Sequence, residues 1–141
     1  MQYDGSLLNY EGQAVYNLIV TVSDGEFSDT ASVTINLSNV NEAPSAADAS
    51  FSIPENSANG SPVGQVLASD PDNNISSYSI SSGDPSGAFA IDSMGNITVA
   101  NGSLLDYEGQ AVYNLVVTVS DGEFSDTASV TINLSNVNEA P

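Results

Sequence analysis

The 141-residue sequence contains a long internal repeat. Residues 5–44 recur as residues 102–141 at an offset of 97 positions. Only two of the 40 aligned pairs differ, namely Asn9 against Asp106 and Ile19 against Val116. A period of this length is too long for a solenoid unit and matches a whole small domain. The sequence therefore predicts a tandem array of domain-sized modules.

The repeat also predicts how the chain is divided. The 57 residues from 45 to 101 occur once and lie between the two copies. We therefore expect one complete module over residues 45–141. Residues 1–44 would be the C-terminal half of a preceding module plus its linker. Met1 is interpreted as a start codon added to a fragment of a longer protein.

The hydrophobic pattern within the module predicts strands. Apolar and polar residues alternate over 128–135, and over 112–119 one face carries Tyr113, Leu115, Val117 and Val119. The turn-forming residues 120–125 join the two segments into a hairpin. No segment shows helical periodicity over 11 residues. Short strands separated by turn residues are typical of a β-sandwich. The other expected strands cover residues 50–53, 64–69, 75–80, 88–91 and 96–100, which makes seven in the module.

The composition excludes many kinds of function. The chain has 18 Asp and Glu residues and no Lys, Arg, His or Cys, so its formal net charge is −18. Without basic residues it lacks the groups that bind nucleic-acid phosphates or anionic membranes. Without Cys and His it lacks thiolate and imidazole metal ligands and the usual general base. Carboxylate, amide and hydroxyl oxygens remain, and these are the ligands of hard cations such as Ca²⁺.

A set of short motifs, in a fixed order, gives the module a family resemblance. The motifs are Pro54-Glu-Asn56, Ala68-Ser-Asp-Pro-Asp72, Ser77-Tyr-Ser-Ile80, Phe89-Ala-Ile-Asp92, Leu105-Asp-Tyr-Glu108, Tyr113-Asn-Leu-Val-Val-Thr-Val-Ser-Asp121 and Asn136-Val-Asn-Glu-Ala-Pro141. Residues 45–141 thereby resemble a cadherin repeat, and residues 5–44 resemble the second half of another. The Ser- and Asn-rich, Cys-free style is similar to the cadherin-like modules of large bacterial surface adhesins. The resemblance implies an all-β, seven-stranded Greek-key sandwich on a secreted or cell-surface protein.

The resemblance also implies two calcium sites, one at each end of the complete module. Loops gather at the ends of a sandwich, and crowded carboxylates repel one another until a divalent ion with six to eight oxygen ligands neutralises them. By the family's motifs, the first set is Glu11, Asn39, Asn41, Glu42, Asp70, Asp72 and Asp121. The second set is Glu55, Asp106, Glu108, Asn136, Asn138 and Glu139.

Both sets depart from the family pattern. Asn9 replaces an expected acidic residue, and the linker Asn39-Val-Asn-Glu-Ala-Pro44 is less acidic than the family's. Residues 1–44 contain no Pro-Glu-Asn, and if the chain is a fragment, as expected, it carries no further module to complete the second set. The hypothesis is that both sites are incomplete in this fragment and bind calcium with reduced affinity.

Several acidic residues have simpler interpretations. Asp70-Pro-Asp72 is also a typical turn sequence, and Asp24 and Asp121 lie in Ser-Asp-Gly segments that favour turns closed by the Asp side chain. Asp106 and Glu108 form a carboxylate pair of the kind used in glycoside hydrolysis, but without a cleft a metal site is the preferred interpretation. The remaining aspartates assigned to solvated surface are Asp29, Asp48, Asp84, Asp92 and Asp126.

The sequence thus predicts a non-enzymatic, calcium-binding cadherin-like module. It would mediate calcium-dependent adhesion or self-association and stiffen the array of repeats. Its expected partners are neighbouring repeats and further copies of itself, the latter through strand exchange by the unpaired hairpin within residues 5–44. Nucleic acid and direct membrane insertion are not expected. The alternatives are a polysaccharide-binding module, which exposed aromatics along one sheet face would favour, and a passive extender.

Overall fold

The computed structural model describes residues 7–140, so Gly5, Ser6 and Pro141 of the repeat lie outside the described residues. The chain divides into two compact units, Met1–Asn41 and Glu42–Pro141. The division lies three residues before the predicted boundary at 44/45. That boundary, and the identity of the first unit as half a module, stay proposals.

The described part of the first unit contains a β-hairpin. Strand β1 (Val15–Ser23) pairs antiparallel with β2 (Ser28–Asn36), from Val15 opposite Asn36 to Ser23 opposite Ser28. The turn between them is closed by Asp24, whose Oδ1 accepts hydrogen bonds from the backbone N–H groups of Glu26 and Phe27 at 2.9 and 2.8 Å. The pairing continues over nine residues of each strand, as alternating β-branched residues favour.

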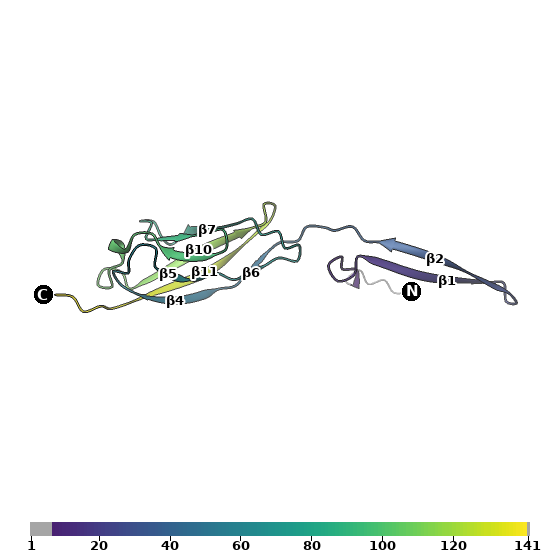
Figure 1. The fold of residues 1–141 in the computed structure, drawn as a ribbon, viewed down its shortest axis with the longest axis horizontal. Coiled ribbons are helices and arrows are strands. Elements are labelled where there is room, and N and C mark those ends of the chain that lie inside the picture. The colour runs from purple at the N-terminus through teal and green to yellow at the C-terminus, as the bar shows by residue number, and fades with distance from the viewer. Residues whose placement is uncertain (1–6, 141) are drawn as a thin grey trace. The chain divides into compact units, whose positions relative to one another are not determined.

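The second unit is a β-sandwich built from two main sheets (Figure 1). One sheet has the order β4-β11-β10-β7 and the other β5-β9-β8, while β3 and β6 form a separate pair. The strands are β3 (Ser45–Ala46), β4 (Ala49–Pro54), β5 (Pro62–Gln65), β6 (Ala68–Ser69), β7 (Ser77–Ser82), β8 (Phe89–Ile91), β9 (Asn96–Val99), β10 (Val112–Ser120) and β11 (Ser125–Ser135). The all-β sandwich expected from the sequence is confirmed.

The core lies between the two main sheets. Tyr113, Leu115, Val117 and Val119 of β10 are buried, as are the alternate residues of β11 from Ala128 to Leu134. They join buried residues of the facing sheet in one cluster, where the Phe89 ring meets the Tyr113 ring edge to face at 5.1 Å. The sequence predicted that every second side chain of 112–119 and 128–135 would face the core, and the structure confirms this.

Strand β4 gives the sheet its mixed character. It runs parallel to β11, from Ala49 opposite Val130 to Pro54 opposite Ser135, whereas every other pairing in the unit is antiparallel. Parallel neighbours need a long crossover, and here almost the whole unit lies between the two strands. The first and last long strands of the unit therefore lie side by side.

One predicted strand is wrong in its extent. Residues 64–69 were expected to form a single strand, but the chain passes from one sheet to another at Val66 and Leu67. Val66 is 1% exposed and fills the core, whereas Leu67 is 64% exposed. The Val66 N–H donates to the Gly95 carbonyl and the Leu67 carbonyl accepts from Ala47. The segment therefore forms β5 and β6, and with the unpredicted β3 the second unit has nine strand segments among its described residues.

The two copies of the repeat have the same pairing but different surroundings. In β10–β11, Leu115 opposes Val130, as Leu18 opposes Val33 in β1–β2. Leu115 and Val130 are at most 1% exposed, whereas Leu18 and Val33 are 42% and 38% exposed. Nearly identical sequence therefore forms the same hairpin twice, but among the described residues only β10–β11 has a sheet packed on its apolar face.

This contrast predicts unequal effects for equivalent truncations. Leu115→Ala should lower the free energy of unfolding of the second unit by about 2–5 kcal/mol, because it leaves a cavity in a packed core. Leu18→Ala, the matched control, should change it by less than about 0.5 kcal/mol, because that side chain is already exposed. Equilibrium urea unfolding of the whole chain in dilute solution measures both. Equal losses for the two variants would contradict the burial seen here.

Candidate metal centre

Three segments that are distant in sequence meet where β4 ends. Gly102 begins a single 3₁₀ turn, Gly102–Leu104, and its N–H donates to Asn59 Oδ1 at 2.7 Å. A Cβ at Gly102 would lie 1.8 Å from the Ser57 carbonyl oxygen, so only glycine permits this close approach. The Asn56 N–H donates to the Leu105 carbonyl at 3.0 Å. These contacts hold the loop that follows, with its acidic residues, against the end of β4.

Glu55 lies at the centre of this arrangement. Its residue is 2% exposed, and its own N–H donates to the Ser135 carbonyl at 3.0 Å. One carboxylate oxygen accepts the Tyr107 N–H and the other accepts the Val137 N–H, both at 2.8 Å. A buried carboxylate is stable only when hydrogen bonds replace its lost hydration. Glu55 therefore ties the end of β4 to the 102–110 loop and to the segment after β11.

Two exposed glutamates complete a carboxylate group with Glu55. One oxygen from each of Glu55, Glu108 and Glu139 lies within 4.8 Å of the other two. Asn56 Nδ2 donates to Glu139 Oε2 at 3.4 Å. Asp106 lies next to the group, since its Oδ1 accepts the Glu108 N–H at 3.2 Å. We call Glu55, Glu108 and Glu139 the glutamate triad.

The triad is electrostatically strained. The pKa of the Glu108 carboxyl is raised above its ordinary value of 4.5. The causes are desolvation, a hydrogen bond with the Glu139 carboxyl and the negative charges of Glu55 and Glu139. Like charges this close disfavour the ionised form, and the chain has no cationic side chain to offset them. A divalent cation would relieve this repulsion.

The remaining residues of the second predicted set are Asn136 and Asn138. They are exposed and flank Val137, whose N–H holds Glu55. The structure thus brings four of the six predicted residues, Glu55, Asp106, Glu108 and Glu139, to one place. That Asn136 and Asn138 contribute ligands stays a prediction.

A second group of acidic residues lies near the start of the second unit. Asp70 is 6% exposed, and its Oδ1 accepts the Asp72 N–H at 2.7 Å. Asp72 in turn accepts the Glu42 N–H through Oδ2 at 2.8 Å. Asn73, which donates to the Asp70 carbonyl at 3.0 Å, adopts a positive φ of 55° that Asn tolerates. Asp70-Pro-Asp72 is thus a tight turn that brings Asp70, Asp72 and Glu42 together.

The other residues of the first predicted set are Asp121, Glu11, Asn39 and Asn41. Asp121 follows β10, and its Oδ1 accepts the N–H groups of Glu123 and Phe124 at 2.8 and 2.7 Å, which closes the hairpin turn. Glu11 and Asn39 are exposed and Asn41 is half-buried in the first unit. Their participation in a site with Glu42, Asp70 and Asp72 stays a prediction.

Several aspartates assigned to solvated surface also bind backbone N–H groups. Asp48 and Asp92 are exposed as predicted, whereas Asp84 and Asp126 are half-buried, which corrects the prediction for those two. Asp84 accepts the N–H groups of Ala88 and Phe89 at 2.8 and 2.9 Å, Asp126 accepts that of Ala46 at 2.8 Å, and Asp48 accepts that of Ser129 at 2.8 Å. Asp92 closes the β8–β9 turn by accepting from the Met94 and Asn96 N–H groups, each at 2.9 Å. Hydrogen bonds from backbone N–H groups, chiefly those of Asn96 and Ala46, hold the pKa of Asp92 and of Asp126 below its ordinary range. The N–H donors either lie far from these aspartates in sequence or face them only because of a turn. The sequence pattern therefore did not predict these hydrogen bonds.

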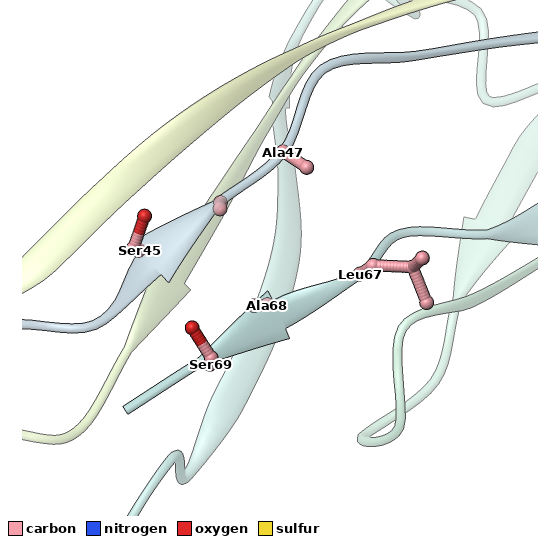
Figure 2. Close-up of a pocket in the computed structure, with 6 residues that line it drawn as sticks. Ser45, Ala47, Leu67, Ala68 and Ser69 are labelled. Carbon is pink, nitrogen blue, oxygen red and sulfur yellow. The ribbon is translucent and has the colours of Figure 1, made fainter. Parts of the chain in front are cut away.

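The structure does not favour a polysaccharide site. Figure 2 shows a shallow hollow beside the β3–β6 pair, and its lining consists of Ser45, Ala46, Ala47, Leu67, Ala68 and Ser69 without an aromatic ring. Phe89 and Tyr113 are buried, and the exposed rings of Tyr10, Phe27, Tyr107 and Phe124 belong to loops and turns. Exposed aromatics along one sheet face, which the polysaccharide alternative required, are therefore not found among the described residues.

No helix among residues 7–140 is long and apolar enough to span a membrane.

Comparisons with known proteins give a consistent result. The model of the cadherin domain family matches residues 49–135. Human protocadherin Fat 4 is 40% identical over 149 residues, which cover 96% of this chain and 3% of that protein. Human cadherin-related family member 2 is 35% identical, over 95% of this chain and 11% of that protein. The chain thus spans only a small part of these relatives.

Solved structures agree on the fold. The extracellular cadherin domains 1–5 of protocadherin gamma B2 superpose with a TM-score of 0.81 at 24% identity, covering 94% of this chain and 28% of that one. Chicken VE-cadherin EC1-2 gives 0.67 at 28% identity, covering 91% of this chain and 70% of that one. The three relatives named with a source are from human and chicken. They do not support the bacterial origin that the Ser- and Asn-rich, Cys-free composition suggested.

The strained triad predicts an unusual pH dependence in metal-free buffer. Because the pKa of Glu108 is raised in the folded state, the folded chain binds more protons than the unfolded chain just above pH 4.5. Stability should therefore increase as the pH falls from 7 toward 5. Asp92 and Asp126, whose pKa values are lowered, act oppositely but only at lower pH, where they become protonated.

Glu108→Gln tests this assignment directly. The variant should melt at a higher temperature than the wild type at pH 7 in chelator, and its gain on acidification to pH 5 should be smaller. Glu123→Gln removes an equal charge from the exposed turn after β10 and serves as the control. If both variants follow the wild-type pH profile, the triad is not the source of the strain.

Proposed function

Because this chain belongs to the cadherin family, we propose that it is a calcium-binding module of a longer, extracellular tandem-repeat protein. In that protein it would contribute to calcium-dependent adhesion or self-association and would stiffen the array of repeats. The observation that carries this proposal is the glutamate triad, which gathers three carboxylates in a chain that has no cationic side chain.

The donor set of the triad suits a hard cation. Carboxylate oxygens are the preferred ligands of Ca²⁺, and each carboxylate oxygen can accept more than one interaction. The two backbone N–H groups that donate to Glu55 fix the orientation of its carboxylate. They leave its oxygens able to bind a cation as well. The raised pKa of Glu108 reflects repulsion that a bound cation would remove. A calcium ion would supply positive charge here, and Glu55, Glu108 and Glu139 would hold it, with Asp106 beside them.

The position of the triad explains how binding would stiffen the chain. Glu55 already connects the end of β4, the 102–110 loop and the segment after β11. A cation held by Glu55, Glu108 and Glu139 would cross-link the same three segments and restrict the last of them, which leads toward a following module. A following module would present residues equivalent to Asp70 and Asp72, which lie near the start of this unit.

The family assignment supports the other parts of the proposal. Cadherin domains occur in the large relatives named above, of which this chain matches only a small part, so neighbouring repeats are the first expected partners. The assignment also favours a non-enzymatic role and an extracellular location. Adhesion itself belongs to the whole protein and is proposed here, not observed.

Calcium titration tests the proposal. Isothermal calorimetry should show binding heat for the wild type, and calcium at about 100 times its dissociation constant should stabilise the fold by about 2.7 kcal/mol. For a domain of this size that corresponds to a rise of about 10 °C or more in melting temperature.

Variants locate the binding site. Glu108→Gln should weaken binding at least about tenfold, since it removes a charged ligand, a loss of about 1.4 kcal/mol. Glu123→Gln is the matched control and should bind like the wild type. Absence of both binding heat and a melting shift in the wild type would refute calcium binding and leave a passive spacer as the function.

A further inference from the structure

Strand β7 forms one open edge of the larger sheet in the second unit. It pairs with β10 on one side, and no other described strand pairs with it on the other side (Figure 1). Residues 49–135, which the cadherin domain model matches, include β4 and every later strand of the unit. The open edge of β7 is therefore a property of the matched domain itself and does not arise from a missing half.

The other edge strands of the second unit carry features that discourage pairing with another chain. β4 ends in Pro54, and Glu55 follows it directly. β5 begins with Pro62, and β8 has three residues and is followed by Asp92. The strands β3 and β6 have two residues each. Short strands, prolines and charges are the usual protection of a sheet edge.

β7 has none of these three features. Its sequence, Ser77-Tyr-Ser-Ile-Ser-Ser82, contains no proline and no charged residue. Tyr78 and Ile80 are half-buried against the core, whereas the serines that alternate with them are exposed. In a chain of formal charge −18, β7 is thus an uncharged edge with an apolar row on its inner side.

Hydrogen bonds in the neighbouring hairpin indicate how the backbone of β10 is directed. The Leu134 N–H donates to the Ala111 carbonyl, and the Asp121 N–H donates to the Phe124 carbonyl. Backbone groups point alternately to the two sides of a strand. The odd-numbered residues of β10 therefore face β11, and the even-numbered ones, such as Thr118, face β7.

This direction fixes which backbone groups of β7 face the open edge. Thr118 lies opposite Ser79, and the pairing is regular from Ser77 to Ile80. The backbone N–H and C=O of Ser79 are therefore directed at β10, and those of Tyr78 and Ile80 are directed at the open edge.

We propose that β7 of one copy pairs antiparallel with β7 of a second copy and joins the two larger sheets into one. The twofold axis would pass beside Ser79, so that Tyr78 of each copy lies opposite Ile80 of the other. This register joins the residues whose backbone groups face the edge. It also places an aromatic and a β-branched side chain opposite each other on the inner face, a pairing that stabilises antiparallel strands. Twofold contacts between identical surfaces are the commonest kind in oligomers.

The distribution of charge favours a second copy over a different partner. A partner attracted by a chain of charge −18 would be basic and would bind its acidic regions. The edge of β7 offers such a partner no carboxylate. In the proposed pair, Ser79 of one copy meets Ser79 of the other on the exposed side. Two acidic chains can therefore meet here without placing carboxylates opposite each other.

A hollow beside the end of β7 gives room for the second copy. It is lined by residues 80–85 and has a volume of about 560 Å³. In an antiparallel pair, the residues that precede one strand lie beside those that follow the other. The residues before β7 of the second copy would therefore lie at this hollow.

The proposal deepens the self-association proposed above, and rests on it, by naming the surface that associates. One strand pair buries little area, so a dimer of this fragment should be weak. In a tandem array several modules can pair at once, and linked contacts strengthen one another without any new contact. The pairing itself needs no calcium.

Single cysteines test the proposed register, because the chain has no Cys of its own. Ser79 of the two copies would form a non-hydrogen-bonded pair with Cα atoms about 4.5 Å apart, a distance that a disulfide can join. Ser79→Cys should therefore form disulfide-linked dimers several-fold faster than Ser52→Cys. Ser52 is exposed on β4, at the opposite edge of the same sheet, and is the matched control. Equal rates in one redox buffer would overturn the proposal.

A charge placed at the axis should prevent the pairing. Analytical ultracentrifugation of the wild type from about 10 µM to 1 mM should show a mass that rises with concentration. Ser79→Asp puts two carboxylates face to face and should stay monomeric, whereas Ser52→Asp adds the same charge elsewhere and should behave like the wild type. A strictly monomeric wild type, or equal association of the two variants, would contradict the proposal. Circular dichroism verifies that both variants fold, and the cysteine experiment decides if Ser79→Asp does not.

Amide hydrogen exchange distinguishes the other possible occupants of the edge. The Tyr78 and Ile80 N–H groups should exchange rapidly in dilute protein and slowly at about 1 mM, while the Ser79 N–H exchanges slowly throughout. Slow exchange of all three in dilute protein would show that another segment of the same chain covers the edge, and the proposal would be wrong.

Running these measurements in chelator and again with calcium separates this proposal from the calcium site. Pairing in chelator would support it even if calorimetry shows no calcium binding. Calcium binding by a chain that stays monomeric, and whose Ser79→Cys variant cross-links no faster than the control, would refute the pairing and leave the calcium proposal intact.

Discussion

The structure depends on carboxylates that are balanced by backbone N–H groups. The chain has 18 acidic residues and no cationic side chain, so salt bridges between side chains are unavailable. Glu55 shows the consequence most clearly. It is buried, and the Tyr107 and Val137 N–H groups bind its two oxygens. Charge-assisted hydrogen bonds of this kind are about twice as strong as neutral ones. Asp84, Asp92 and Asp126 close turns or join segments in the same way. Where carboxylates outnumber the available N–H groups, as at the glutamate triad, repulsion remains, and this is where we propose that a cation binds.

The repeat gives an internal comparison of local and tertiary effects. β1–β2 and β10–β11 share their sequence, turn closure and register, and Asp24 and Asp121 accept equivalent backbone hydrogen bonds. Their local structure is therefore independent of surroundings. Burial is not, because it requires the facing sheet that residues 45–101 supply only once. A two-stranded hairpin alone buries little apolar surface, so the apolar residues of β1–β2 stay exposed in this chain.

Much of the fold could be predicted from the pattern of residues, but not all of it. Strict alternation over 128–135, with the apolar face of 112–119 beside it, predicted the central hairpin and its buried face. The segment 64–69 was misjudged because its hydrophobic pattern looks continuous, whereas the break at Val66 results from a hydrogen bond to Gly95, which is distant in sequence. Similarly, the family's motifs predicted Glu55, Glu108 and Glu139 as members of one set. No sequence signal indicated that Glu55 would be buried and held by two N–H groups.

The sequence by itself determined most of the strands, the hairpin turns and the negative charge, because these depend on residue type and short-range spacing. Tertiary structure alone decided which carboxylates receive hydrogen bonds from backbone N–H groups and which are left repelling one another. That outcome depends on which backbone N–H groups point at each carboxylate, and the N–H groups on Glu55 come from residues 52 and 82 positions away. It also decided which of two identical apolar faces is buried. Burial depends on a partner surface, and the sequence of the buried element does not record whether that partner is present.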